Sequence, residues 1–409
     1  MPVGCDLAHI AQSALISNDN PTRVAVAVSG GSDSMAVLHV MAEVARTCGI
    51  SLFAVTVDHA LRDGSAAEAA GVAQACEGLG VPHQVLVWQH GEIKGNLMDA
   101  ARRARYGLMA DWACGLGISH ILLGHTADDQ AETFLMGLAR RAGIDGLIGM
   151  HAGWNTGGVR FLRPYLGVTR QALRAELVRR SVGWIDDPSN ENDRFTRVKA
   201  RRALTALQPL GITVEGLAGV MVNLSAAQGA VQQSTHDAIG MCREHAGAVM
   251  FDGVMWRAAG AEVQRRLLIA ALRWVSSGLA PRGAGVDRVL QAVERGKDTV
   301  LAGCRVRMTA DGFCVVREAR FAGVSVLGAL WDGRWQIIGP FGPGQEVRAL
   351  GAGLAECKGW RETGICRDVL EVGPAVWAGE TLISAPIAGF KAGFDARIVA
   401  SFTQFVLSH

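Results

Sequence analysis

Ser29-Gly-Gly-Ser-Asp-Ser34 separates an apolar run at residues 23–28 from a stretch with helical periodicity at 35–48. The apolar run is typical of a buried strand, so these six residues are expected to form the turn between a strand and a helix. A pair of glycines lets backbone N–H groups converge on an anion, and the serine hydroxyls and the helix N-terminus add further donors. The stretch therefore predicts a loop that cradles a pyrophosphate group.

This loop differs from two other kinds of phosphate loop. It lacks the GxGxxG spacing of dinucleotide-binding turns, and no Gly-Lys-Ser/Thr closes it as in a Walker loop. Asp33 would repel a bound phosphate unless a cation lay between them, so we expect Mg²⁺ there, with Asp33 as a ligand. The nucleotide-binding residues expected in the loop are Ser29, Gly30, Gly31, Ser32, Asp33 and Ser34.

The flanking sequence repeats the alternation of strand and helix, and Ser65-Ala-Ala-Glu68 forms a capping box before one of the helices. We expect strands at 23–28, 52–57, 84–87 and 120–123, and helices at 35–48, 66–79, 97–115 and 127–141. Units of this length predict an α/β domain, a parallel doubly wound sheet with helices on both faces. Ligands bind such sheets at the carboxyl ends of the strands, so the loops after residues 28, 57 and 123 are the expected site.

The rest of the chain changes character twice. Residues up to 209 are expected to form a strand, a helix, a turn and a basic helix, at 158–162, 169–181, 184–190 and from about 194. The segment 210–295 is rich in Ala, Leu and Gln with helical periodicity, and from 299 onward short β-rich runs alternate with Gly-rich turns. The expected domains are a catalytic one at 1–209, a helical one at 210–297 and a small β-containing one at 298–409.

Composition excludes several classes of protein. With 409 residues, 49% of them hydrophobic and 19% charged, the chain is typical of a globular protein of two or three domains. The longest uncharged stretch, between Glu215 and Asp237, is interrupted by polar residues, which indicates a buried helix and not a membrane span. The N-terminus has no basic segment leading into an apolar run, so we expect a cytoplasmic protein.

The cysteines and the charges give two further indications. The nine cysteines are an odd number without a CxxC spacing, which argues against a disulfide framework, a zinc ribbon and an iron–sulfur site. The net charge is only +2, but residues 160–202 contain eleven Arg or Lys against five acids. This local excess indicates either a solvated basic face or a surface for nucleic acid.

Several further segments carry charged or polar residues. They are Val57-Asp-His-Ala-Leu-Arg62, Ala101-Arg-Arg-Ala-Arg-Tyr106, Gly124-His-Thr-Ala-Asp-Asp-Gln-Ala-Glu-Thr133, Gly143-Ile-Asp-Gly-Leu147, Trp184-Ile-Asp-Asp-Pro-Ser-Asn190 and Arg194-Phe-Thr-Arg197. Together with the loop at 29–34, their order and spacing resemble the tRNA(Ile)-lysidine synthetase family of the N-type ATP pyrophosphatases (PP-loop superfamily), over about residues 22–210. The resemblance implies an adenine nucleotide alpha hydrolase-like fold for the N-terminal domain.

The resemblance also implies a reaction and its partners. A ligase of this family uses ATP and Mg²⁺ to join L-lysine to C2 of the wobble cytidine in the CAU anticodon of tRNA(Ile). An adenylated cytidine forms first, and the products are lysidine, AMP and pyrophosphate. The two C-terminal domains would contact the tRNA. No membrane would be involved, and the sequence leaves open whether two copies of the chain form a homodimer. The lysine amine must lose a proton, and the sequence does not identify the acceptor.

Asp129 and Glu132 are three residues apart, so their carboxylates share one face of the expected helix, with Asp128 beside them. The pair could hold a metal ion or the ammonium group of an amino acid, and the resemblance implies both, with Asp129 as a second metal ligand. The alternative is that these acids only complement the partial positive charge of the helix N-terminus.

The remaining site residues also depend on the resemblance. His125 and Arg105 would lie near the reacting phosphate and Arg197 at the active site, so that the implied catalytic residues are Arg105, His125, Asp129, Glu132 and Arg197. Asp58 and His59 would border the adenosine, although they are also compatible with ordinary helix-capping chemistry. The basic residues around Arg197 would meet the RNA backbone. Val198 departs from the family, which usually has Asn at this position.

Three alternatives remain. A tRNA thiolase of the same superfamily normally needs paired cysteines, and a glutamine-dependent ligase needs an N-terminal cysteine where this chain has Pro2. A non-catalytic nucleotide-binding or RNA-binding protein would be expected to lack the acids and bases outside the loop. All five implied catalytic residues are present, which favours the ligase.

Overall fold

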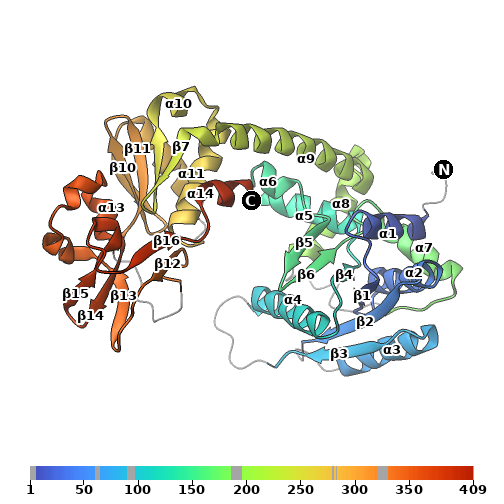
Figure 1. Ribbon diagram of the computed structural model, residues 1–409. Coiled ribbons are helices and arrows are strands. Elements are labelled where there is room, and N and C mark those ends of the chain that lie inside the picture. Colours follow the sequence, from blue (N-terminus) through green and yellow to red (C-terminus); the bar gives the residue numbers. More distant parts are fainter. Residues whose placement is uncertain are drawn as a thin grey trace. The chain divides into compact units, whose positions relative to one another are not determined.

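The structure is a computed structural model that describes residues 6–59, 65–89, 97–185, 196–278, 281, 283–319 and 330–408. The chain forms two compact units, Met1–Gln228 and Gly229–His409, each described here by itself (Figure 1). The first unit carries the phosphate loop and all the predicted site residues. The turn at 186–190 and Arg194 lie outside the described residues.

A six-stranded sheet forms the centre of the first unit, with strand order β3-β2-β1-β4-β6-β5. Five of the strands are parallel, and β5 pairs with β6 in the antiparallel direction at one edge. The strands are β1 (Arg23–Ala27), β2 (Ser51–Asp58), β3 (His83–Val87), β4 (His120–Leu123), β5 (Gly153–Thr156) and β6 (Val159–Leu162). The predicted doubly wound α/β sheet is therefore confirmed, while β5 was not predicted.

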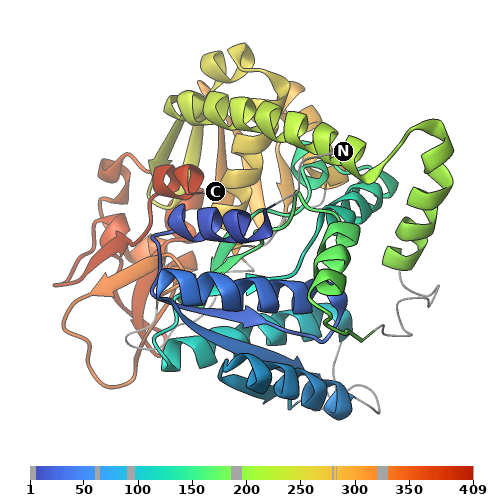
Figure 2. The same cartoon turned by 90° about the vertical axis from the view of Figure 1, so that its right-hand side faces the viewer.

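Helices cover both faces of this sheet because alternate strand residues point to opposite sides. Val24 and Val26 pack with α1 (Leu7–Ile16) and α2 (Ser32–Cys48), which lie side by side (Figures 1 and 2). Ala25, between the two valines, packs instead with α4 (Leu97–Gly115). The apolar run at 23–28 is thus buried on both faces, as its composition predicts.

The helices of this unit lie close to their predicted positions, except α1 and α6, which were not predicted. They are α1, α2, α3 (Ser65–Leu79), α4, α5 (Ala127–Ala139), α6 (Ile144–Leu147), α7 (Arg170–Arg179), α8 (Thr196–Leu207) and α9 (Val214–Asp237). The helix α2 begins at Ser32, three residues before its predicted start, so the last three residues of the phosphate loop form the first turn of the helix. The α3 capping box involves Ser65, whose side chain is not among those described.

The prediction that residues 215–237 form a buried helix is wrong in its burial. They form α9, in which only Met221 and Thr235 are buried, while Val222 is 68% exposed. The polar residues that interrupt the stretch leave no continuous apolar face to bury. Among the described residues, no single helix is long and apolar enough to cross a membrane. Thr196–Leu210 and Val214–Met241 reach the necessary length and apolar composition only when they are taken together, and they are bent by 98° to one another.

The second unit contains three antiparallel sheets. The largest has the order β7-β8-β11-β10-β9, and the others are β12-β16 and β13-β14-β15. Their strands are β7 (Cys242–His245), β8 (Ala248–Asp252), β9 (Thr299–Leu301), β10 (Cys304–Thr309), β11 (Gly312–Arg317), β12 (Trp335–Ile338), β13 (Gln345–Ala349), β14 (Pro374–Ala378), β15 (Thr381–Ser384) and β16 (Asp395–Ile398). The β-rich runs predicted after residue 299 are confirmed as strands.

Among the described residues, five α-helices belong to the second unit besides the end of α9. They are α10 (Gly253–Ala258), α11 (Ala261–Val275), α12 (Gly283–Glu294), α13 (Arg367–Glu371) and α14 (Phe402–Leu407). The helices α9 to α12 confirm the helical character of residues 210–297, but β7 and β8 lie in the same range and β8 pairs with β11. One sheet thus extends across residue 297, and the three-domain division remains a prediction.

Candidate active site

Most of the predicted site residues follow three adjacent strands, while Arg105 and Arg197 lie on α4 and α8. In the sheet β1 lies between β2 and β4, and all three run parallel. The phosphate loop after β1 is therefore placed between the end of β2, where Asp58 is the last residue and His59 follows it, and His125, which follows β4. This is the carboxyl edge of the sheet, where open α/β folds bind their ligands.

The phosphate loop is held by its own serines. The Ser29 backbone N–H donates to Ser34 Oγ at 3.1 Å, and Ser34 Oγ donates to the Gly31 carbonyl at 3.0 Å. Ser32 Oγ donates to Asp33 Oδ1 at 3.1 Å. The loop closes over the first turn of α2, so the free N–H groups of this helix N-terminus are directed towards the place of a bound anion.

Two glycines allow close contact around the loop. Gly30 has φ of +86°, in the region that favours glycine, and its carbonyl accepts from the Ile185 N–H at 2.9 Å. A Cβ on Gly124 would lie 2.8 Å from the Asp33 carbonyl carbon and the Ser34 nitrogen. The loop after β4 therefore touches the phosphate loop backbone to backbone, and only glycine fits at position 124.

The predicted acids lie at the start of α5. Thr126 and Asp129 form a capping box, in which Asp129 Oδ2 accepts from the Thr126 N–H and hydroxyl, both at 2.9 Å. Asp129 is 7% and Glu132 1% exposed, whereas acids that only complement a helix dipole stay in solvent. Glu132 Oε2 is buried and has no hydrogen-bond partner among the described residues.

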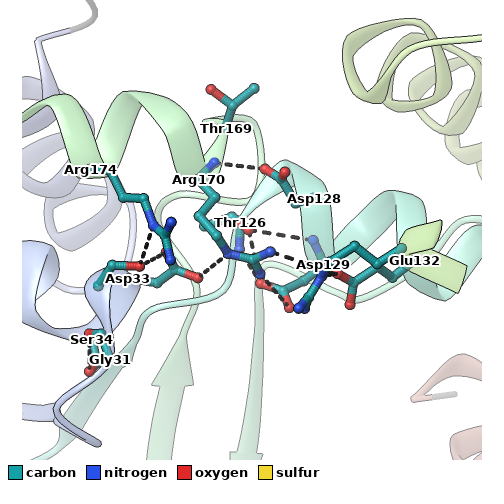
Figure 3. Close-up of polar contacts among 12 residues, drawn as sticks. Gly31, Asp33, Ser34, Thr126, Asp128, Asp129, Glu132, Thr169, Arg170 and Arg174 are labelled. Atoms are coloured by element: carbon teal, nitrogen blue, oxygen red, sulfur yellow. Dashed lines mark hydrogen bonds and ion pairs between the residues drawn. The ribbon is translucent and has the colours of Figure 1, made fainter. Parts of the chain in front are cut away.

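A residue that we had not predicted for the site, Arg170, joins these acids to the phosphate loop (Figure 3). Its Nε lies 2.9 Å from Asp33 Oδ2, its Nη2 lies 3.4 Å from Asp129 Oδ1, and its Nη1 lies 3.7 Å from Glu132 Oε1. Its backbone N–H donates to Asp128 Oδ2 at 2.7 Å. The guanidinium thus binds three carboxylates, and Arg170 as a whole contacts four acids near the phosphate loop: Asp33, Asp128, Asp129 and Glu132.

The acids respond differently to this shared cation. Burial raises the pKa of Asp33, although Arg170 favours its ionised form. Burial acts in the same direction on Asp129, but Arg170 and the Thr126 N–H outweigh it, so the pKa of Asp129 is lowered. Burial also raises the pKa of Glu132 in spite of Arg201. Asp129 therefore holds its negative charge most firmly.

Further arginines surround the same cluster from α7 and α8. Arg174, one turn after Arg170, has its Nε 3.2 Å from Ser32 Oγ. Arg201 pairs with Glu132 Oε1 at 2.9 Å, and Arg197 Nη1 lies 3.9 Å from Asp129 Oδ1. Arg197 thus lies at the acids, on their outer side, and is 43% exposed.

His125 lies on the other side of Asp129, among arginines. Arg163 Nε donates to His125 Nδ1 at 3.1 Å. Burial lowers the pKa of His125, and Arg163, Arg105 and Arg197 lower it further, against the opposing effect of Asp129. Arg105 lies against the ring of Tyr106, 5.0 Å from its centroid, and donates to its hydroxyl at 3.3 Å. The imidazole is therefore neutral and faces a concentration of positive charge.

Two predicted residues are not joined to this cluster by a described contact. The Asp58 carbonyl accepts from the Trp88 N–H, and His59 makes an edge-to-face contact with the Trp88 ring at 5.9 Å. They border the loop from the side of β2. Val198, where the family usually has Asn, is 7% exposed on α8, so this residue serves packing here.

The two predicted metal ligands can be tested on this geometry. Asp33 and Asp129 contact the same guanidinium, Asp33 through Nε and Asp129 through Nη2, so one cation already lies beside both carboxylates. Among the described residues, no group of three or more His, Cys, Asp or Glu could hold a metal ion. Mg²⁺ usually binds one or two carboxylates and completes its shell with phosphate oxygens and water. The two acids therefore fit a magnesium ion that arrives with a nucleotide.

Comparison with known proteins identifies the family of this chain. Residues 7–208 match the PP-loop domain model. The tRNA(Ile)-lysidine synthase of Ruegeria pomeroyi is 41% identical over 97% of this chain and 96% of its own length. The chain belongs to the tRNA(Ile)-lysidine synthase family. Another member, from Rhizobium meliloti, is 34% identical over 90% of this chain and 84% of its own. The family is thus similar to this chain beyond the PP-loop domain, into the second unit.

Among solved structures, a U34-tRNA thiolase from Methanococcus maripaludis is similar with a TM-score of 0.46. It is 14% identical, and the match covers 54% of this chain and 77% of that one. This likeness is too weak to support an argument about function, and the family assignment depends on the relatives above.

Arg163 and Arg170 were counted in the basic segment of the sequence but were not assigned to the site. Arg163 directly follows β6, and Arg170 is the first residue of α7 after its cap Thr169. The signal that could have found Arg163 is its position at the carboxyl end of a parallel strand. No local pattern identifies Arg170, whose partner Asp33 is 137 residues away.

Proposed function

We propose that this protein joins L-lysine to C2 of the wobble cytidine in the CAU anticodon of tRNA(Ile), using ATP and giving lysidine, AMP and pyrophosphate. The observation that carries this proposal is the carboxylate cluster beside the phosphate loop, in which Asp129 and Glu132 are buried and Glu132 Oε2 has no hydrogen-bond partner among the described residues. The family membership and the match over nearly the whole chain give it independent support.

In the first step the loop at 29–34 would bind the β and γ phosphates of ATP at the N-terminus of α2. The C2 carbonyl oxygen of the cytidine attacks the α-phosphate, and the bond to pyrophosphate breaks. Arg105 and His125 would donate to the oxygens of the α-phosphate, where negative charge develops. Asp58 and His59 would border the adenosine from the end of β2.

In the second step the ε-amine of lysine attacks C2 and AMP leaves. Asp129 and Glu132 would bind an amino group of lysine, with Arg170 moving away from them to admit it, and Arg197 lies beside Asp129. Two acids near an ammonium group raise its pKa, so the attacking amine must give its proton to an acceptor.

Asp33 and Asp129 would hold Mg²⁺ as the nucleotide binds. The ion would neutralise charge on the phosphate oxygens. Binding of Mg²⁺ and binding of a lysine amino group thus both require that a cation replace the Arg170 guanidinium, which contacts these carboxylates.

The tRNA would lie along exposed cations and the second unit. Lys199 and Arg202 are exposed on α8 and would contact the phosphate backbone, which supplies affinity without reading sequence. Residues 210–297 and 298–409 would contribute the further tRNA contacts. We propose the cytoplasm as the compartment, where tRNA and ATP are present.

The test is incorporation of radiolabelled lysine into unmodified tRNA(Ile) with a CAU anticodon, with and without ATP. We expect ATP-dependent label with the wild type, loss of label with Asp33→Ala, and no change with Glu77→Ala, an exposed acid on α3 that serves as the control. ATP cleavage to AMP and pyrophosphate without any label would overturn lysine as the acceptor while keeping the adenylation chemistry.

A further inference from the structure

Arg163, which directly follows β6, has a buried side chain that several contacts hold in place. Its side chain is almost fully buried, at 6% exposure. Its guanidinium lies 4.0 Å from the centroid of the Trp154 ring on the neighbouring strand β5, and its Nη1 donates to the His151 carbonyl at 2.7 Å. A cation–π contact and a hydrogen bond together fix the plane of the guanidinium. The direction of the Nε–H, which lies in the same plane, is therefore defined as well.

That direction is towards His125, whose Nδ1 accepts from Arg163 Nε at 3.1 Å. A guanidinium has only donors and keeps its proton in proteins, so the nitrogen facing it must carry a lone pair. A flipped imidazole would place a carbon against the N–H and lose the bond. The ring is therefore neutral, with its proton on Nε2.

The groups around the ring support the same state. Arg105 and Arg197 add positive charge and Asp129 opposes them, while burial disfavours the imidazolium. A neutral imidazole with Nε2–H is a fixed donor, available to an oxygen that gains negative charge. It does not have to release or gain a proton during the reaction.

We propose that Arg163 is a positioning residue for adenylation, which acts through His125 by fixing the tautomer that presents Nε2–H to the α-phosphate. This rests on the proposed function for the identity of the phosphate. The tautomer itself rests only on the contacts of Arg163. The inference thus has one part that can be tested without substrate and one that requires the reaction.

The first test is ¹⁵N NMR of protein labelled in its eleven histidines. The resonances of His125 are assigned as those missing from His125→Asn. We expect a neutral ring with its proton on Nε2 in the wild type at pH 7, and loss of this fixed state in Arg163→Gln. A proton on Nδ1, or an imidazolium, in the wild type would overturn the proposal.

The second test is a double-mutant cycle on pyrophosphate release with ATP and tRNA but without lysine. We expect Arg163→Gln to lower kcat by about 10–100-fold, as loss of an orienting partner commonly does, with a small change in KM for ATP. In a His125→Ala background the same change should cost less than about threefold. The full loss in that background would overturn the inference.

Arg160→Gln, on the strand that Arg163 follows, is the control, because the described hydrogen bonds of the Arg160 side chain are to Asn18 and Asn155 only. We expect it to leave the rate unchanged. If Arg163→Gln does not fold, Arg163→Lys keeps the charge and the stem but cannot make both contacts at once. The fixed Nε2–H state in a protein that releases no pyrophosphate would refute the proposed function and leave the tautomer assignment standing.

Discussion

The acidic and the basic side of the candidate site differ in what surrounds their charges. On the acidic side Arg170 lies against the carboxylates of Asp33 and Asp129, so cation and anions neutralise one another. On the basic side Arg163 contacts an imidazole nitrogen, a carbonyl and an indole ring, none of which carries a charge. The first arrangement is suited to exchange one cation for another, and the second keeps its positive charge for an anion.

This comparison predicts that the two sides affect different steps. Arg105→Gln should lower pyrophosphate release without lysine by about 100-fold or more, because it removes a cation that would face the α-phosphate in the proposed reaction. Arg103→Gln is the matched control, since Arg103 is exposed on the same helix. An equal loss in both variants would show that the positive charge of α4 as a whole matters, and would contradict a specific role for the basic side of the site.

Removing the cation on the acidic side should affect stability. Arg170→Ala leaves three carboxylates facing one another, and loss of one partner of a largely buried ion pair costs about 3–5 kcal/mol. Arg179→Ala on the same helix, with a side chain 67% exposed, should leave the free energy of urea unfolding nearly unchanged.

The effect of Mg²⁺ on the stability of the same variant can also be predicted. If Asp33 and Asp129 form its site, the ion should raise the melting temperature of Arg170→Ala more than that of the wild type, where the guanidinium competes. Equal shifts in the two proteins would mean that the ion binds elsewhere.

The contact between the two loops can be tested with a single methyl group. Gly124→Ala places a Cβ within 2.8 Å of the backbone of Asp33 and Ser34. We expect a loss of about 1–3 kcal/mol in the free energy of unfolding and a raised KM for ATP, because the phosphate loop must move. Gly167→Ala has open space around its Cβ and is the control.

The smallest expected effect concerns pH. The pKa of His125 is lowered, chiefly by burial, so the neutral ring is retained as the pH falls through 6.5, the ordinary value. The rate of pyrophosphate release should therefore change by less than about twofold between pH 8 and 6 through this group. A fall with an apparent pKa near 6.5 that disappears in His125→Asn would contradict the neutral donor.

Much of the fold could be predicted because the signals are local. The strand β4 and the helix α4 lie at their predicted residues, since a short apolar run and a long amphipathic stretch need little context. The strands β5, β7 and β8 were missed because strands of four or five residues have weak patterns, and their stability comes from pairing with other strands. The exposure of α9 was misjudged for the same reason, since burial is a property of neighbours.

The phosphate loop, the strands and helices of the parallel sheet, the motifs that carry the family resemblance and the acids of α5 could all be recognised in the sequence. Each of these features depends on residue types within a few positions of one another. Only the tertiary structure decided which cations meet them. Arg170 and Asp33 are 137 residues apart, and they meet because α7 packs against α2. Arg163 and His125, 38 residues apart, meet because β6 pairs with β4. Such contacts are set by packing and strand order, which no local pattern specifies.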